Sequence, residues 1–191
     1  MLTALNVAYE ETEKRSFLRF NLESFLFTLG GLFGVLLALT IIVGLPAVLN
    51  LVLWWLGPLT AVAIRVASFL LLLAFVMLAL AVLYRYGPSR AEAEWHWVTP
   101  GSFLAALLWF AASLLFSFYV SNFGSYDAAY GSLGAVIVAL MWFYISAFAV
   151  MLGAELNAEL ELQTRRDTTT GPIKPMGERG AFVADHVATT S

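Results

Sequence analysis

Long apolar runs separated by short polar stretches dominate the chain. No acidic or basic residue occurs from Ser24 to Ile64, and a straight helix over that distance would be about 60 Å long. The hydrocarbon core of a bilayer is only about 30 Å thick. The run must therefore divide into two membrane spans, and the breakpoints that it offers are Pro46, Asn50 and the pair Gly57-Pro58.

The whole pattern predicts an all-α fold, a polytopic membrane protein with four transmembrane helices. An interfacial stretch ending at Trp54 and Trp55 follows the first span, since tryptophan rings suit the headgroup boundary. Pro100 stands just ahead of the third span, where a missing N–H costs nothing. The predicted spans are about 24–45, 59–83, 101–120 and 132–153.

The two terminal segments are expected to face the cytoplasm. Residues 1–23 form an amphipathic N-terminal segment, 24–162 the four-helix transmembrane domain, and 163–191 a mostly disordered tail, because the tail has too few contiguous apolar residues to form a core. Every lysine and arginine except Arg65 falls on one side of the spans. Basic residues collect on the cytoplasmic side, so both termini are placed there.

Composition excludes several classes of function. The chain is 61% hydrophobic and 12% charged, whereas soluble domains carry about 25% charged residues. It has no cysteine and two histidines, which excludes disulfides and thiolate metal sites. The formal charge of −3 provides no basic field for nucleic acid. No cofactor, metal site or nucleic-acid partner is predicted, and the lipid bilayer is the expected surrounding.

Two glutamates near the end of the fourth span are candidate site residues. Glu155 and Glu159 are four apart and share a helix face, with Asn157 turned away from them. They are interpreted as a polar exit from the membrane, as a proton or cation site lining a cavity, or as a helix contact in which Glu155 or Asn157 bonds a neighbour.

A second candidate group lies toward the opposite side of the membrane. Arg65 is the basic residue of that half, and Asp127 is the acidic residue of the loop between the third and fourth spans. Arg65 either pairs with Asp127, reaches the interface alone, or holds an anionic headgroup or substrate. Tyr130 belongs to the same polar loop and is included in the predicted transport cavity.

Glycines are candidate helix-packing positions. Gly30 and Gly34 have the spacing that lets two helices approach closely in lipid, and Gly131 and Gly134 stand at the start of the fourth span. Packing is the first interpretation for all four. The alternative is a hinge or a break in a helix of the kind that transporters use.

Three stretches carry a family resemblance. The chain resembles the YihY/BrkB family of bacterial inner-membrane proteins through Trp97-Val98-Thr99-Pro100-Gly101-Ser102, Tyr130-Gly131-Ser132-Leu133 and Gly153-Ala154-Glu155-Leu156-Asn157. The resemblance implies an architecture of about six spans, of which this sequence corresponds to the C-terminal two-thirds. It also implies the labels attached to that family, which range from ribonuclease BN to virulence factor and transporter.

The preferred functional hypothesis is a transporter or an exporter of lipid or envelope components that moves an amphipathic or anionic molecule. The alternative is a structural or assembly factor, acting as a homo-oligomer or beside an envelope-biogenesis partner. An enzyme is not expected. Glu92, Glu94 and His96 are the nearest approach to a nuclease site, and they are better explained as the polar face of an interfacial helix.

Overall fold

The computed structural model describes residues 1–53, 57–123 and 132–188. Most of these residues are helical, and among them a single antiparallel bridge joins Ala93 to Thr169. The described helices that are long and apolar enough to cross a membrane are Phe17–Leu49, Leu59–Tyr86, Trp95–Asn122 and Leu133–Leu162. The predicted all-α, four-span fold class is therefore confirmed.

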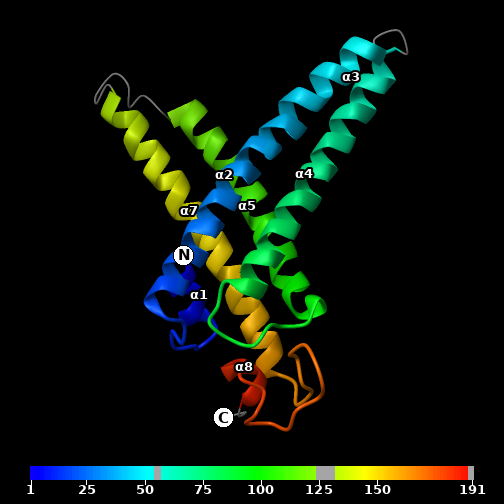
Figure 1. Ribbon diagram of the computed structural model, residues 1–191. Helices are drawn as coiled ribbons and strands as arrows, with labels where there is room; N and C mark the ends of the chain where they lie inside the picture. The colour runs from blue at the N-terminus through cyan, green and yellow to red at the C-terminus, as the bar shows by residue number, and fades with distance from the viewer. Residues whose placement is uncertain (54–56, 124–131, 189–191) are drawn as a thin grey trace.

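The helices form two hairpins, visible in Figure 1. The first hairpin consists of α2, its continuation α3, and α4; the second consists of α5 and α7. The hairpins meet near the chain termini, and their far ends diverge. The elements in chain order are α1 (Leu2–Ala8), α2 (Phe17–Leu39), the π-turn η1 (Thr40–Gly44), α3 (Leu45–Leu53), α4 (Pro58–Tyr86), α5 (Trp95–Phe123), α7 (Ser132–Leu162) and α8 (Phe182–Asp185).

Pro46 does not end the first span, which corrects the predicted boundary near Leu45. Helical structure continues from Phe17 through η1 into α3 and on to Leu53. Proline cannot donate to the carbonyl four residues before it, and its ring clashes with that carbonyl. The π-turn Thr40–Gly44 lies directly ahead, and such a widened turn takes up this misfit without breaking the helix. Trp54 and Trp55 lie outside the described residues.

The tail is ordered from 163 to 188, in contrast to the disordered segment predicted there. Its backbone bonds the α4–α5 loop, with N···O distances of 2.9 Å from Glu94 to Thr168 and 2.9 Å from Thr170 to Glu92. The buried Arg179 side chain donates to tail carbonyls, including that of Ala184 at 2.6 Å. A polar segment thus becomes ordered without a core of its own because neighbouring groups satisfy its backbone.

Burial is concentrated at the end of the molecule that carries both termini. We call this end the base: residues 1–16, the α4–α5 loop, the tail, and the adjoining turns of α4, α5 and α7. Its core combines α1 with these turns, through residues that include Leu5, Tyr9, Tyr84, Val98, Ala105, Ala154, Ala158 and Val183. By contrast, α2 has no buried residue. We call the other ends of α2 to α7 the outer halves.

Candidate functional site

The structure separates the candidate residues at the end of α7. Glu155 and Glu159 are exposed, whereas Asn157 has an exposed fraction of 0%. The predicted opposition of the two faces is therefore present. The two glutamates lie on the exposed face of α7, and Asn157 lies on the buried face.

The other predicted site residues are not brought to this cluster. Arg65 is exposed in the outer half of α4, at the opposite end of the spans from Glu155. Asp127 and Tyr130 lie outside the described residues, so the predicted pair between Arg65 and Asp127 stays a prediction. The predicted cavity residues that the structure describes therefore do not come together. Arg65 lies in the outer half of α4, whereas Glu155, Asn157 and Glu159 lie near the other end of the spans, in α7.

The predicted packing glycines differ from one another in their surroundings. A Cβ at Gly30 would meet nothing within 4 Å, and one at Gly34 would touch the Phe75 ring at 3.6 Å. Gly134 is buried, and Gly131 lies outside the described residues. Within the described chain, Gly30 therefore contacts no other helix.

The closest helix crossing uses a different pair of glycines. A Cβ built on Gly101 of α5 would overlap the Gly153 carbonyl oxygen, and one on Gly153 of α7 would lie 2.5 Å from the Gly101 oxygen. No side chain fits between backbones this close. The two glycines therefore set the distance between α5 and α7 at the base.

Asn157 fastens the same crossing. Its Oδ1 accepts a 2.7 Å bond from the Gly101 N–H, and its Nδ2 donates to the Val98 carbonyl at 3.2 Å. Tyr84 adds α4 to the junction by donating to the Val150 carbonyl at 2.7 Å. Side chains of two helices thus bond backbone groups of their neighbours, an arrangement suited to an environment where apolar burial gives little drive for association.

A buried ion pair lies one turn beyond Asn157. Arg90 from the α4–α5 loop donates to both oxygens of Glu161, at 3.1 and 2.7 Å, and the two side chains are 1% and 0% exposed. Thr168 of the tail donates to the same carboxylate at 2.6 Å. Such a bidentate pair depends on having every partner in place, because either charge left alone would be buried without compensation.

Tyr9 completes this cluster from the end of α1. The Arg90 guanidinium lies 5.0 Å from the centre of the Tyr9 ring. The Tyr9 hydroxyl is buried beside Asn157, without a partner at hydrogen-bond geometry among the described residues. Burial raises the pKa of Tyr9, and the nearby charge of Arg90 opposes that rise only in part. We call Tyr9, Arg90, Asn157, Glu161 and Thr168 the base cluster.

Glu161 was not among the predicted site residues, although the sequence contains a signal for it. Gly153, Asn157 and Glu161 are four apart and share a helix face. Ala154 and Ala158 border the same face and are buried. A face of small residues that carries an amide and a carboxylate is typical of a packed polar junction. The partners Arg90 and Thr168 could not be chosen in this way, because each comes from a separate segment.

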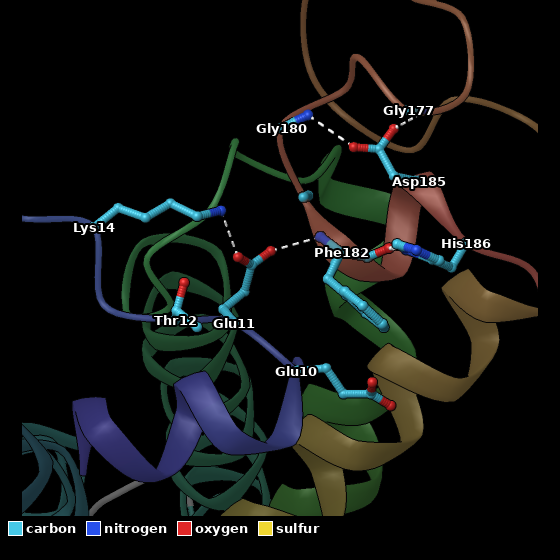
Figure 2. Close-up of a pocket in the computed structure, with 10 residues that line it drawn as sticks. Glu10, Glu11, Thr12, Lys14, Gly177, Gly180, Phe182, Asp185 and His186 are labelled. Carbon is cyan, nitrogen blue, oxygen red and sulfur yellow. Dashed lines mark hydrogen bonds and ion pairs between the residues drawn. The ribbon is translucent and has the colours of Figure 1, made fainter.

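An open groove of about 470 Å³ separates the N-terminal segment from the tail, as Figure 2 shows. Glu11 crosses it, accepting from the Phe182 N–H at 2.6 Å and from the Lys14 ammonium at 2.7 Å. Asp185 accepts backbone N–H bonds from the tail, including that of Gly177 at 2.7 Å. The bonded carboxylates of the groove therefore hold the tail in place.

Comparison with known proteins assigns this architecture to one family. The family model described as "Virulence factor BrkB" matches residues 1–176. The chain is 35% identical over 167 residues to YfkH of Bacillus subtilis, which is named as a ribonuclease-like protein; the match covers 84% of this chain and 58% of YfkH.

Relatives named UPF0761 membrane protein match shorter stretches. That of Chlorobium phaeobacteroides is 34% identical over 120 residues, covering 63% of this chain and 26% of the relative. That of Tolumonas auensis is 37% identical over 79 residues, covering 41% and 26%. The chain thus spans little more than half the length of YfkH and about a quarter of these two relatives. No solved structure matches it.

Proposed function

Because the chain belongs to the BrkB family of membrane proteins, we propose that it is a transport or export component that moves an amphipathic or anionic molecule across the bacterial inner membrane. The family and the four apolar helices make it a multi-pass membrane protein. Both termini lie in the cytoplasm in this proposal, since the base and the first turn of α2 carry every lysine and arginine except Arg65.

The observation that carries the proposal is the contrast between a fastened base and diverging outer halves. Helices α4, α5 and α7 are bonded together at Tyr84, Asn157 and Gly101. The two hairpins stay in contact as far as the rings of Phe69 and Phe110, and their far ends spread apart (Figure 1). Large apolar side chains of the outer halves are exposed, among them Leu114, Phe118 and Leu140. Such surfaces accept acyl chains, so an amphipathic molecule is the class that fits them best.

Arg65 supplies the polar part of the proposal. From Pro58 to Tyr84 of α4, Arg65 is the one charged residue. Its side chain is exposed, and nearby residues of the helix, such as Val62 and Val66, are apolar and exposed as well. A charge within a span is costly unless it meets an interface, a counter-ion or a polar ligand. Its role here is to attract the anionic end of the transported molecule.

The test uses the full chain reconstituted in vesicles of phosphatidylcholine with a trace of fluorescent phosphatidylglycerol. Dithionite added outside reports how fast the probe crosses the bilayer. We expect protein to accelerate crossing and Arg65→Ala to slow it, whereas Arg19→Ala, which alters another exposed arginine, should leave it unchanged. Crossing no faster than in empty vesicles would refute transport of this lipid class, and equal rates for Arg65→Ala and the parent would refute the role of Arg65.

Single cysteines test the proposed orientation. The chain has no native cysteine, so each labelling signal is assignable to the residue introduced. A membrane-impermeant thiol reagent should reach position 65 in intact cells and position 155 only in inverted vesicles. The reverse pattern would place the base outside and would contradict the proposed topology.

A non-transporting assembly factor is the second candidate, and the base favours it. Arg90, Asn157 and Glu161 are bonded within the chain, as expected for a rigid scaffold. In-cell crosslinking from position 114 or 118 in the outer halves should then recover one constant protein partner or a second copy. Crosslinks to lipid alone, together with probe transport, would decide against this candidate.

We also propose that the chain is not a nuclease, although YfkH is named as ribonuclease-like. Glu92 is engaged by Arg85 at 3.0 Å, and Glu94 lies 3.4 Å from the His96 ring nitrogen. A nuclease needs carboxylates available for a metal or for water activation. RNA cleavage by purified protein that disappears in both Glu92→Gln and Glu94→Gln would overturn this proposal.

A further inference from the structure

Arg85, the next-to-last residue of α4, is a buried arginine whose bonds are incomplete. The residue is 8% exposed. Its Nη2 donates to Glu92 Oε2 at 3.0 Å, but the buried Nε and Nη1 have no hydrogen-bond partner among the described residues. A guanidinium offers five N–H donors, and leaving buried donors unpaired is costly. The site therefore lacks an acceptor.

Aromatic rings lie against the guanidinium. Its central carbon is 4.6 Å from the centre of the Trp95 ring and 5.3 Å from that of Tyr86. Attraction to a ring face stabilises the positive charge, but it does not replace an oxygen acceptor in the guanidinium plane. Trp95 and Tyr86 are themselves 45% and 41% exposed. The covering of Arg85 therefore includes two side chains that reach the surface.

The position of Arg85 identifies the kind of acceptor. Arg85 lies at the end of the candidate span Leu59–Tyr86, and Trp95 is the first residue of the candidate span Trp95–Asn122. Both spans thus meet the bilayer boundary here, where phosphate groups of lipids lie and where tryptophan and tyrosine gather. The first turn of α5 also begins at Trp95, and the N–H groups at a helix start favour an anion.

Glu92 marks the place that the acceptor would take. Its side chain is 49% exposed, so its bond to Arg85 is a surface pair of low net value that another anion can displace. Phosphate and carboxylate groups can both accept two parallel N–H bonds from one guanidinium, but Glu92 accepts only one from Arg85. Glu94 on the same segment opposes an anion, so phosphate must gain its affinity from Arg85 and from the bilayer that presents it.

We propose that Arg85 binds the phosphate group of an anionic phospholipid at the base side of the membrane, with Glu92 as the partner it exchanges and Trp95 as the ring that moves aside. This site is distinct from Arg65 and does not rest on the proposed transport function. A lipid held here would occupy the boundary between α4 and α5 whether or not the protein moves lipids.

The experiment measures how much phosphatidylglycerol the purified full chain retains. The protein is exchanged into nanodiscs of phosphatidylcholine that contain about 10% phosphatidylglycerol, an anionic lipid, and the bound lipid is then counted by native mass spectrometry. Arg85→Gln should lower the retained lipid roughly tenfold, the effect of losing a charged hydrogen bond. Arg19→Gln is the matched control and should retain the parental amount, since Arg19 is exposed and pairs with Glu23 at 2.8 Å.

Two further arms keep the proposal decidable. Glu92→Gln removes the competing carboxylate and should raise retention, and this result holds even if Arg85→Gln fails to fold. Millimolar inorganic phosphate should not displace the lipid; displacement would identify a free-phosphate site and overturn the lipid assignment. Equal retention in the parent, Arg85→Gln and Glu92→Gln would overturn the proposal as a whole.

Discussion

The base and the outer halves of this protein are built from similar helices but are stabilised differently. At the base, α5 and α7 cross with Gly101 and Gly153 in backbone contact, and Asn157 bonds α5 directly. In the outer halves, residues such as Leu114 and Leu115, each 71% exposed, have no comparable contacts. The same chain therefore contains a region defined by specific bonds and another whose surface suits lipid.

The difference follows from the solvent that each region meets. Lipid tails are as apolar as leucine, so burying leucine against leucine gains little within a bilayer. Close helix contact must then come from small residues and from hydrogen bonds. The base has both, and it also has the buried pair of Arg90 and Glu161, whereas the outer halves have apolar side chains that lipid can cover.

Removing Glu161 should break the base most severely. Glu161→Ala leaves the buried Arg90 guanidinium without its carboxylate and frees Thr168, so the free energy of unfolding should fall by about 3–5 kcal/mol. Thermal unfolding of the protein in detergent checks this value. The matched control is Glu159→Ala, an exposed position on the same helix, which should change stability by less than about 0.5 kcal/mol. Equal effects of the two variants would show that the ion pair does not stabilise the base.

A methyl group at the helix crossing should have the next largest effect. Gly101→Ala places a Cβ against the Gly153 carbonyl, so the helices must separate, at a cost of about 1–3 kcal/mol. Gly30→Ala, which meets open space on α2, should be neutral or slightly stabilising because alanine favours helix. Thermal unfolding measures both variants. A larger loss from Gly30→Ala would mean that α2 has a close partner in the membrane.

Relieving strain should stabilise the base by a smaller amount. Glu10 follows α1 with φ of 54°, a left-handed conformation at the end of a helix where glycine is favoured. Glu10→Gly should therefore raise the free energy of unfolding by about 1 kcal/mol. Glu10→Ala removes the same carboxylate but keeps the strain, and it separates the two effects in the same unfolding assay. A gain in Glu10→Ala equal to that in Glu10→Gly would contradict the explanation by strain.

Acid should loosen the tail, with no effect at neutral pH. Burial alone would raise the pKa of Asp185, but backbone N–H bonds from Arg179, Gly177 and Gly180 outweigh it and hold the pKa below its usual range. Because the folded pKa is the lower one, this contribution to stability is present above the pKa of the unfolded aspartate, about 3.9, and is lost as the pH falls through the folded value.

A fluorescent label at the exposed position 178 would follow this release as the pH is lowered. Asp185→Asn, which cannot ionise, should shift or flatten the transition relative to the parent protein. Superimposable acid transitions in the two proteins would assign the release to other carboxylates. One of these is Asp167, which also accepts backbone N–H bonds within the tail, from Lys174 and Thr169, and whose pKa they lower.

The amino-acid sequence by itself determined the four spans and the family. Both depend on features that are local in the chain: apolar runs long enough to cross a bilayer, and short ordered motifs such as Gly153-Ala154-Glu155-Leu156-Asn157. Length and polarity decide such spans because no backbone group can stay unbonded in lipid, which leaves the helix as the available form.

Only the tertiary structure decided which polar residues belong together. Glu155, Glu159 and Glu161 look alike in the sequence, yet the fold buries Glu161 alone of the three. The same holds for the tail, whose order depends on the α4–α5 loop and on Glu11, 171 residues away from its partner Phe182 in the chain. A buried charge is tolerated only where its partners meet it, and that meeting is a property of three dimensions.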